Sequence, residues 1–307
     1  MRDLGRQDLG ARELAAGCAV EEMSVQMALL AGASVEERWM DVDGGRMRYL
    51  RAGAGPPLIL LHGLLGYSFS WRYAMPALAP FANVYALDLL GSGFSDRPRG
   101  INHSLQASAR RVLKFTENLG LSSYDLLGAS LGGGLAMRTA ALVPHRVRRL
   151  ILAAPVNPWS AQGSWRASFL TSPLVASLFL RIAPHFEATH TYFLRRLYGD
   201  PRRLQPGTIH GYSAPFAIPG AFEQVLGTLH EWKQTLQELE SVLPLIADVP
   251  ALLLWGSADK AVSLSSSEYL RRLFKNSRLV VFEGVGHVPF EEVPDDFNRA
   301  VIDFLRS

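Results

Sequence analysis

Short, mostly apolar runs alternate with helix-like stretches along most of this chain. The apolar runs occupy residues 57–61, 84–88, 124–127, 147–153, 249–256 and 278–282, and the runs 57–61 and 249–256 contain no charged residue. A short run without polar interruption is typical of a strand buried on both faces, as in a parallel sheet. The stretches with helical character occupy residues 70–78, 104–119, 131–142, 265–274 and 296–305. Strands that alternate with helices predict an α/β fold, with a mostly parallel sheet and helices on both of its faces.

A β-hairpin precedes this alternation. The segments Arg38–Val42 and Met47–Arg51 flank Asp43-Gly44-Gly45, and glycines suit the positive φ angles of a tight hairpin turn. With the hairpin, the pattern predicts eight strands in all.

The alternation stops between Pro155 and about Leu243. Helical runs at 169–182, 188–198 and 221–242 are separated by prolines there, and aromatic residues are frequent. We expect residues 155–245 to form a helical cap inserted into a core made of residues 37–154 and 246–307. Most of its aromatic side chains should form its own core, and some should line an apolar pocket.

Residues 1–36 form an N-terminal extension with one apolar helical face, made by Val20, Met23, Met27 and Leu30. We expect this helix to pack on the domain or on the partner subunit of a homodimer. A disordered tail and a later start at Met23 or Met27 are the alternatives.

Composition and charge exclude several classes of protein. The chain has 307 residues, of which 48% are hydrophobic and 19% charged, and a net charge of +3 from scattered arginines. A nucleic-acid groove would need a denser basic stripe. The single cysteine, Cys18, forms no intramolecular disulfide and fits a reducing cytoplasm. No secretory signal and no apolar run long enough for a membrane span is present, so we expect a cytoplasmic protein.

The sequence Gly128-Ala129-Ser130-Leu131-Gly132 lies between a predicted strand and a predicted helix. Gly-x-Ser-x-Gly in this setting is typical of a sharp turn that holds a serine hydroxyl at the carboxyl end of the sheet. The start of the helix behind it offers free N–H groups and a positive dipole. A glycine-rich turn with a chance serine is the alternative.

Asp259 and His287 also follow predicted strands, and the carboxyl ends of parallel strands share one edge of a sheet. The chain order Ser130, Asp259, His287 is the order expected for an α/β-hydrolase triad. His287 would act as the base that activates Ser130, and Asp259 would orient the imidazole and stabilise its protonated form. Taken singly, Asp259 could be a turn residue and His287 a loop residue.

Two other parts of the sequence, His62 and Gly91-x-Gly93, resemble functional motifs. His62 follows the first parallel strand, and its simplest role is to orient its loop by hydrogen bonds. Gly91-x-Gly93 suggests a nucleotide loop, but it lacks a third glycine and a following helix, so we reject that interpretation.

These residues resemble the α/β-hydrolase superfamily over about residues 37–305. The matching stretches are 62–66 (HGLLG), 88–95 (DLLGSGFS), 128–133 (GASLGG), 255–259 (WGSAD) and 286–289 (GHVP). The resemblance implies a serine-nucleophile member of the esterase and lipase type, with a cap inserted after the sixth strand. It also implies an oxyanion hole made by the backbone N–H groups of Leu64 and Leu131, in which His62 and Gly63 form the supporting loop. Asp88 and Ser92 match structural positions of the family.

Positions where this sequence departs from the family's sequence pattern narrow the range of reactions that we expect. Ala129, before the nucleophile, offers no polar side chain to a substrate. Epoxide hydrolases and haloalkane dehalogenases of this layout use an aspartate nucleophile, whereas residue 130 is serine. Hydrolases of carbon–carbon bonds often carry Trp after the histidine, where this chain has Val288 and Pro289.

We therefore expect a serine hydrolase that cleaves an apolar small-molecule ester or lactone through an acyl-enzyme, with no metal and no organic cofactor. The sequence has no HExxH, CxxC or P-loop motif. Carbon–carbon bond hydrolysis, acyl transfer and a non-catalytic ligand-binding role on the same fold are the alternatives.

Overall fold

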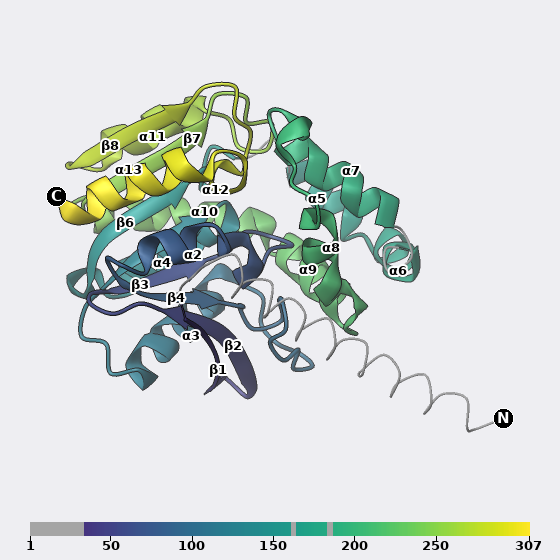
Figure 1. Ribbon diagram of the computed structural model, residues 1–307. Coiled ribbons are helices and arrows are strands. Elements are labelled where there is room, and N and C mark those ends of the chain that lie inside the picture. The colour runs from purple at the N-terminus through teal and green to yellow at the C-terminus, as the bar shows by residue number, and fades with distance from the viewer. Residues whose placement is uncertain (1–33, 161–163, 183–186) are drawn as a thin grey trace.

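The computed structural model describes residues 34–160, 164–182 and 187–307 (Figure 1). Most of the predicted N-terminal extension, residues 1–33, therefore lies outside the described residues. None of the helices in the described ranges is both long and apolar enough to cross a membrane.

An eight-stranded sheet forms the centre of the molecule, in the order β1-β2-β4-β3-β5-β6-β7-β8. Its strands are β1 Val35–Val42, β2 Gly45–Ala52, β3 Pro57–Leu61, β4 Asn83–Leu87, β5 Tyr124–Ala129, β6 Val147–Ala153, β7 Ala251–Gly256 and β8 Ser277–Phe282. The pairs β1–β2 and β2–β4 are antiparallel, and all other pairs are parallel. The predicted mostly parallel sheet is confirmed.

The hairpin turn is tighter than predicted. Val42 pairs with Gly45, so only Asp43 and Gly44 lie in the turn, with φ angles of 53° and 80°. Two successive positive φ angles are the mark of the turn that matches strand twist.

Both faces of the central strands are covered, which explains apolar runs such as 57–61. In β3, Leu58 and Leu60 pack into one core, Ile59 and Leu61 pack into the other, and all four side chains are fully buried. The first core is closed by α2, α12 and α13, and the second by α3, α4, α10 and α11. These helices are α2 Ala74–Leu78, α3 Leu105–Asn118, α4 Leu131–Leu142, α10 Trp232–Val242, α11 Ser265–Leu273, α12 Pro289–Glu292 and α13 Pro294–Arg306.

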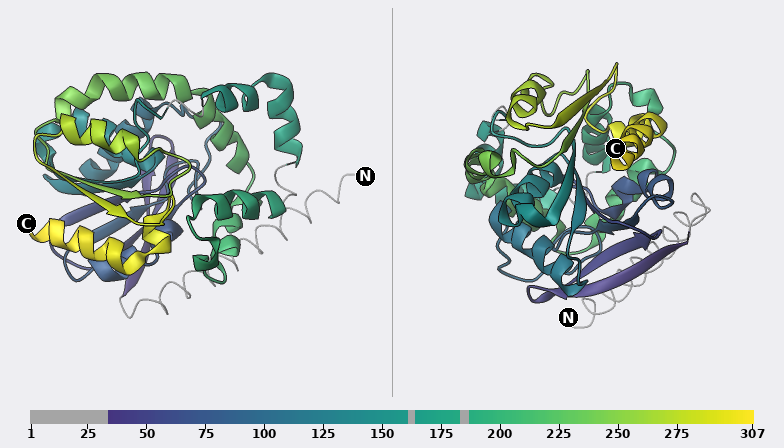
Figure 2. Two further views of the ribbon diagram at one scale, coloured as in Figure 1. Left: turned by 90° about the horizontal axis from the view of Figure 1, so that it is seen from above. Right: turned by 90° about the vertical axis from the view of Figure 1, so that its left-hand side faces the viewer.

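The helices between β6 and β7 divide into two groups. In the left-hand view of Figure 2, the teal and green helices α5 to α9 stand beyond one end of the sheet. They are α5 Ser164–Leu170, α6 Pro173–Ile182, α7 Glu187–Leu197, α8 Thr208–Ser213 and α9 Ala221–His230. In contrast, α10 runs back along the sheet, where Leu236 and Leu239 join the core cluster of α3 and α4.

Three predicted helical runs differ from the structure, and the first of them, 169–182, is interrupted at residues 171–172 between α5 and α6. The run 221–242 is broken at Glu231 into α9 and α10, because the two halves pack against different partners. The run 70–78 is a 3₁₀ helix, η1 Ser68–Trp71, followed by the short α2. Further 3₁₀ helices in the described ranges are η2 Pro144–Arg146, η5 Pro201–Arg203, η6 Ala214–Ala217 and η7 Leu243–Ile246.

Asp88 holds together the loops that follow β3 and β4. Its fully buried carboxylate accepts hydrogen bonds from the backbone N–H groups of Ser68 at 2.8 Å and Phe94 at 2.9 Å. Arg48 of β2, whose side chain is also buried, donates to the same carboxylate at 3.2 Å. One carboxylate thus connects the sheet to both loops.

Replacing Asp88 by Ala should destabilise the protein by about 3–5 kcal/mol, because it leaves the buried Arg48 guanidinium without one of its carboxylate partners and orphans two N–H groups. Urea unfolding followed by fluorescence measures the loss. The matched control is Glu268→Ala, which removes an exposed pair with Arg271 and should cost less than about 1 kcal/mol. Equal effects of the two substitutions would show that Asp88 does not hold the loops.

Candidate active site

Ser130 lies at the sharp turn between β5 and α4, with a φ of 52° and a ψ of −119°. A residue with a side chain rarely adopts a positive φ, so the surrounding structure must hold it there. Its N–H donates to the Ala153 carbonyl at 2.9 Å, and its own carbonyl accepts from Gly133 at 3.0 Å and Val156 at 2.8 Å. The strained backbone is therefore fixed from both sides.

The glycines around Ser130 allow backbones to touch. A Cβ added at Gly132 would lie 2.2 Å from the Leu61 carbonyl oxygen, so no side chain fits between α4 and the end of β3. A Cβ added at Gly63 would lie 3.8 Å from Ser130 Oγ. The loop after β3 therefore passes directly beside the Ser130 hydroxyl.

Two backbone N–H groups at this contact have no acceptor among the described residues, those of Leu64 and Leu131. Leu64 lies on the loop beside Ser130 and lines the cavity described below. Leu131 is the first residue of α4, so its N–H lies at the positive end of the helix dipole. Two such donors beside a hydroxyl can stabilise an oxyanion.

His62 orients this loop through both of its ring nitrogens. Its Nε2 accepts from the Leu89 N–H at 3.1 Å, which leaves Nδ1 as the protonated nitrogen that donates to the Gly63 carbonyl at 2.8 Å. Burial lowers the pKa of the His62 imidazole, although the Gly63 carbonyl and the Asp88 carboxylate partly offset that effect. His62 is therefore a neutral bridge between the loops after β3 and β4.

His287 and Asp259 are brought together from the loops after β8 and β7. His287 Nδ1 lies 2.8 Å from Asp259 Oδ2, and both side chains are buried. The other carboxylate oxygen, Oδ1, accepts from the N–H groups of Ala261 at 2.8 Å and Val262 at 3.0 Å. The carboxylate is thus held in place to orient the imidazole.

Ser130 and His287 line one cavity with a volume of about 380 Å³. Its wall is largely apolar, with contributions from Leu64, Leu65, Phe193, Leu194, Leu197, Ile209, Phe216, Val288 and Phe290. Within the described residues, the Ser130 hydroxyl makes no hydrogen bond to His287. In ligand-free sites such bonds are often long and tighten when substrate binds. Asp259 lies behind His287, away from the cavity wall.

A buried ion pair that the sequence analysis missed forms part of the same wall. Glu291 of α12 faces Arg72, and both side chains are almost fully buried. Tyr212 of α8 donates to the carboxylate at 2.7 Å, and Arg72 donates to Thr208 at 3.1 Å. Burial by itself would lower the pKa of Arg72. The charge and hydrogen bonds of the facing Glu291 carboxylate together outweigh that effect, so the pKa lies above its ordinary value. The pair therefore connects α8 to η1 and α12.

A second missed carboxylate, Glu292, connects the end of α7 to the His287 loop. It accepts from the N–H groups of Gly199 at 2.9 Å, Asp200 at 2.9 Å and Gly286 at 2.8 Å. The His287 N–H itself donates to the Leu197 carbonyl at 2.6 Å. The loop that carries the imidazole is thus built against α7.

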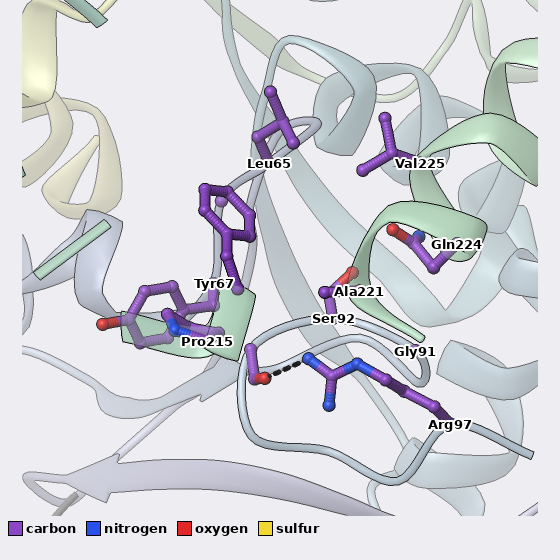
Figure 3. Close-up of a pocket in the computed structure, with 12 residues that line it drawn as sticks. Leu65, Tyr67, Gly91, Ser92, Arg97, Pro215, Ala221, Gln224 and Val225 are labelled. Atoms are coloured by element: carbon purple, nitrogen blue, oxygen red, sulfur yellow. Dashed lines mark hydrogen bonds between the residues drawn. The ribbon is translucent and has the colours of Figure 1, made fainter. Parts of the chain in front are cut away.

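The Gly91-x-Gly93 loop lines a separate hollow of about 20 Å³, shown in Figure 3. Arg97 donates to the Gly93 carbonyl at 2.6 Å there, and Gln224 of α9 also lines the hollow. The hollow has room for about one water molecule, far too little for a nucleotide. Within the described ranges, no group of three or more His, Cys, Asp or Glu side chains is placed to hold a metal ion.

Comparisons with known proteins cover most of the chain. A family model described as alpha/beta hydrolase fold matches residues 56–294. Haloalkane dehalogenase 2 of Mycobacterium bovis is 30% identical over 285 residues, covering 87% of this chain and 94% of the relative. The 2-hydroxy-6-oxo-2,4-heptadienoate hydrolase of Pseudomonas putida is 31% identical over 268 residues, covering 83% and 91%. The crystal structure of a bacterial membrane phospholipase A matches with a TM-score of 0.79 and 26% identity, covering 99% and 96%.

The buried, neutral His62 should make the protein less stable in mild acid. The unfolded chain takes up a proton at a pKa of about 6.5, whereas the folded pKa is lower. The stabilisation is therefore present above about pH 6.5 and is lost as the pH falls. Urea midpoints measured between about pH 7.5 and pH 5 should fall less steeply for His62→Asn than for the native protein. The exposed His145 gives the control, since His145→Asn should keep the native slope; equal slopes for all three proteins would contradict the assignment.

Proposed function

The chain belongs to the alpha/beta hydrolase fold family, and we propose that it is a serine hydrolase that cleaves a carboxylic ester or lactone through an acyl-enzyme on Ser130. One observation carries the proposal: at a single apolar cavity a strained serine, a histidine hydrogen-bonded to a buried aspartate, and two free N–H groups come together. Each of these groups has a distinct task in acyl transfer.

In the proposed reaction, Ser130 Oγ attacks the carbonyl carbon while His287 Nε2 takes up the hydroxyl proton. Asp259 keeps the other ring proton on Nδ1 and stabilises the imidazolium. The negative charge that forms on the carbonyl oxygen is bound by the N–H groups of Leu64 and Leu131. His287 then gives its proton to the leaving alcohol, and a water molecule activated by His287 releases the acid.

The helices α5 to α9 act as the cap in this proposal. Phe193 and Leu197 of α7 and Phe216 of η6 contribute to the cavity wall opposite the sheet. A wall of this kind excludes water and favours an apolar acyl or alcohol group. A phospholipase A by definition cleaves a carboxylic ester, so the similar solved structure supports the same bond type.

A serine at position 130 argues against dehalogenation, although the chain is similar to haloalkane dehalogenase 2. A carboxylate that displaces a halide becomes an ester, which water can hydrolyse. A serine that displaced a halide would become an ether, which histidine and water do not cleave. Ser130 therefore favours substrates with a carbonyl carbon.

Hydrolysis of a carbon–carbon bond is the second candidate. It is favoured by the 31% identity to the heptadienoate hydrolase, and it would use the same three side chains, Ser130, Asp259 and His287. The difference lies in the leaving group, a carbanion that must be protonated at carbon rather than an alcohol.

Ser130→Ala should lower turnover of an aryl ester by about 10³-fold or more, with the KM nearly unchanged, because the nucleophile is lost while the cavity remains. A fluorophosphonate probe should label the native protein and fail to label the variant. The control is Ser213→Ala, which removes another hydroxyl from the same cavity and should keep both turnover and labelling. Full activity of Ser130→Ala, or absence of labelling in folded native protein, would overturn the assignment and favour a ligand-binding role.

A panel of 4-nitrophenyl esters of graded chain length, lactones and ring-fission dienones distinguishes the two candidates. We expect esters to be hydrolysed and dienones to remain, because Val288 and Pro289 replace the tryptophan that such hydrolases often carry after the histidine. Mass spectrometry detects the products of both ester hydrolysis and carbon–carbon bond hydrolysis. Turnover of the dienone with inert esters would establish the second candidate instead.

A further inference from the structure

Two cationic side chains stand at the solvent side of the catalytic cavity. Arg196 of α7 and Lys260, the residue after Asp259, both line it, and both are exposed. They also line a neighbouring hollow of about 390 Å³, together with Arg195. The two hollows therefore meet at Arg196 and Lys260, which places these cations at the mouth of the cavity.

None of these cations has a carboxylate partner within the described residues. Arg196 donates to the Tyr192 hydroxyl at 3.0 Å, and no ion pair involves Arg195 or Lys260. The only acidic side chain in the described lining of either hollow is Glu291, which is buried and paired with Arg72. The mouth thus carries positive charge without a counter-ion, and such charge attracts and orients anions.

The backbone segments that carry the two cations are held next to His287 and Asp259. Leu197, the neighbour of Arg196, accepts the His287 N–H at 2.6 Å. Lys260 lies between Asp259 and Ala261, which are joined by a hydrogen bond of 2.8 Å. The favourable position of basic residues at a helix C-terminus accounts for Arg196 on α7, but it gives no reason for a lysine on the loop after β7.

We infer that the substrate carries a carboxylate, which Arg196 and Lys260 bind at the cavity mouth while the apolar part of the substrate reaches Ser130. The inference rests on the proposed hydrolytic function and narrows its substrate class to esters of mixed character, apolar in the middle and anionic at one end. Charge-assisted hydrogen bonds at the mouth would orient such a molecule with its carbonyl toward Ser130.

The test compares two esters with the same acyl chain, 4-nitrophenyl hydrogen adipate and 4-nitrophenyl methyl adipate, in which the terminal carboxylate is free or masked by a methyl group. The native enzyme should favour the anionic ester by about 10-fold in kcat/KM. The double variant Arg196→Gln/Lys260→Gln should lose that preference through a higher KM, while its activity on the methyl ester stays native. Added salt should weaken the preference of the native enzyme alone.

Arg202→Gln is the matched control, since Arg202 is an exposed arginine that lines neither hollow and pairs with Asp200. It should keep the preference. A native enzyme without preference, or a double variant that loses activity equally on both esters, would overturn the inference. A second pair, 4-carboxyphenyl butanoate and its methyl ester, moves the carboxylate to the alcohol side and shows which part of the substrate the cations bind.

A binding measurement separates this inference from the proposed function. If neither adipate ester is hydrolysed, the hydrolytic proposal fails, and calorimetric titration with monomethyl adipate and dimethyl adipate decides the inference alone. Tighter binding of the anion to the native protein, reduced about 10-fold in the double variant, supports the anion site. Equal affinities for the two compounds contradict it.

Discussion

The candidate active site depends on a contact between two backbones. The first turn of α4 lies against the end of β3 so closely that Gly132 has no space for a side chain. This contact sets the distance between the Ser130 turn and the loop that carries Gly63 and Leu64. It also keeps Ser130 in a conformation that a free chain would leave, since its backbone is bonded to β6 and to α4 at once. The remaining groups of the site are arranged around this fixed point.

Much of the fold could be predicted from the sequence because the sheet is covered on both faces. Strands buried in this way consist almost entirely of apolar residues, so β3 and β7 were identifiable to within two residues. The placement of Ser130, Asp259 and His287 near one another could be predicted because a parallel arrangement gathers the carboxyl ends of strands at one edge of the sheet. Helix ends were less predictable. The helical periodicity of 221–242 continues through Glu231, and only tertiary packing divides it.

The polar network around the site could not be predicted, because its members look ordinary in the sequence. Arg72 and Glu291 are 219 residues apart, and neither lies in a motif. Glu292 resembles a solvated acid at the start of a helix, yet it is buried. Arg196 and Lys260 resemble surface charges, and only the course of the chain brings them to one opening. Residues whose role depends on a distant partner carry no local signal.

The carboxylate of Glu292 has a mechanical consequence. It fastens the chain just beyond α7 to the loop of His287, and the Leu197 carbonyl adds a further bond. A displacement of this end of α7 would shift the His287 imidazole relative to the Ser130 hydroxyl. The spacing of these two side chains across the cavity therefore depends on the seating of α7 on the His287 loop.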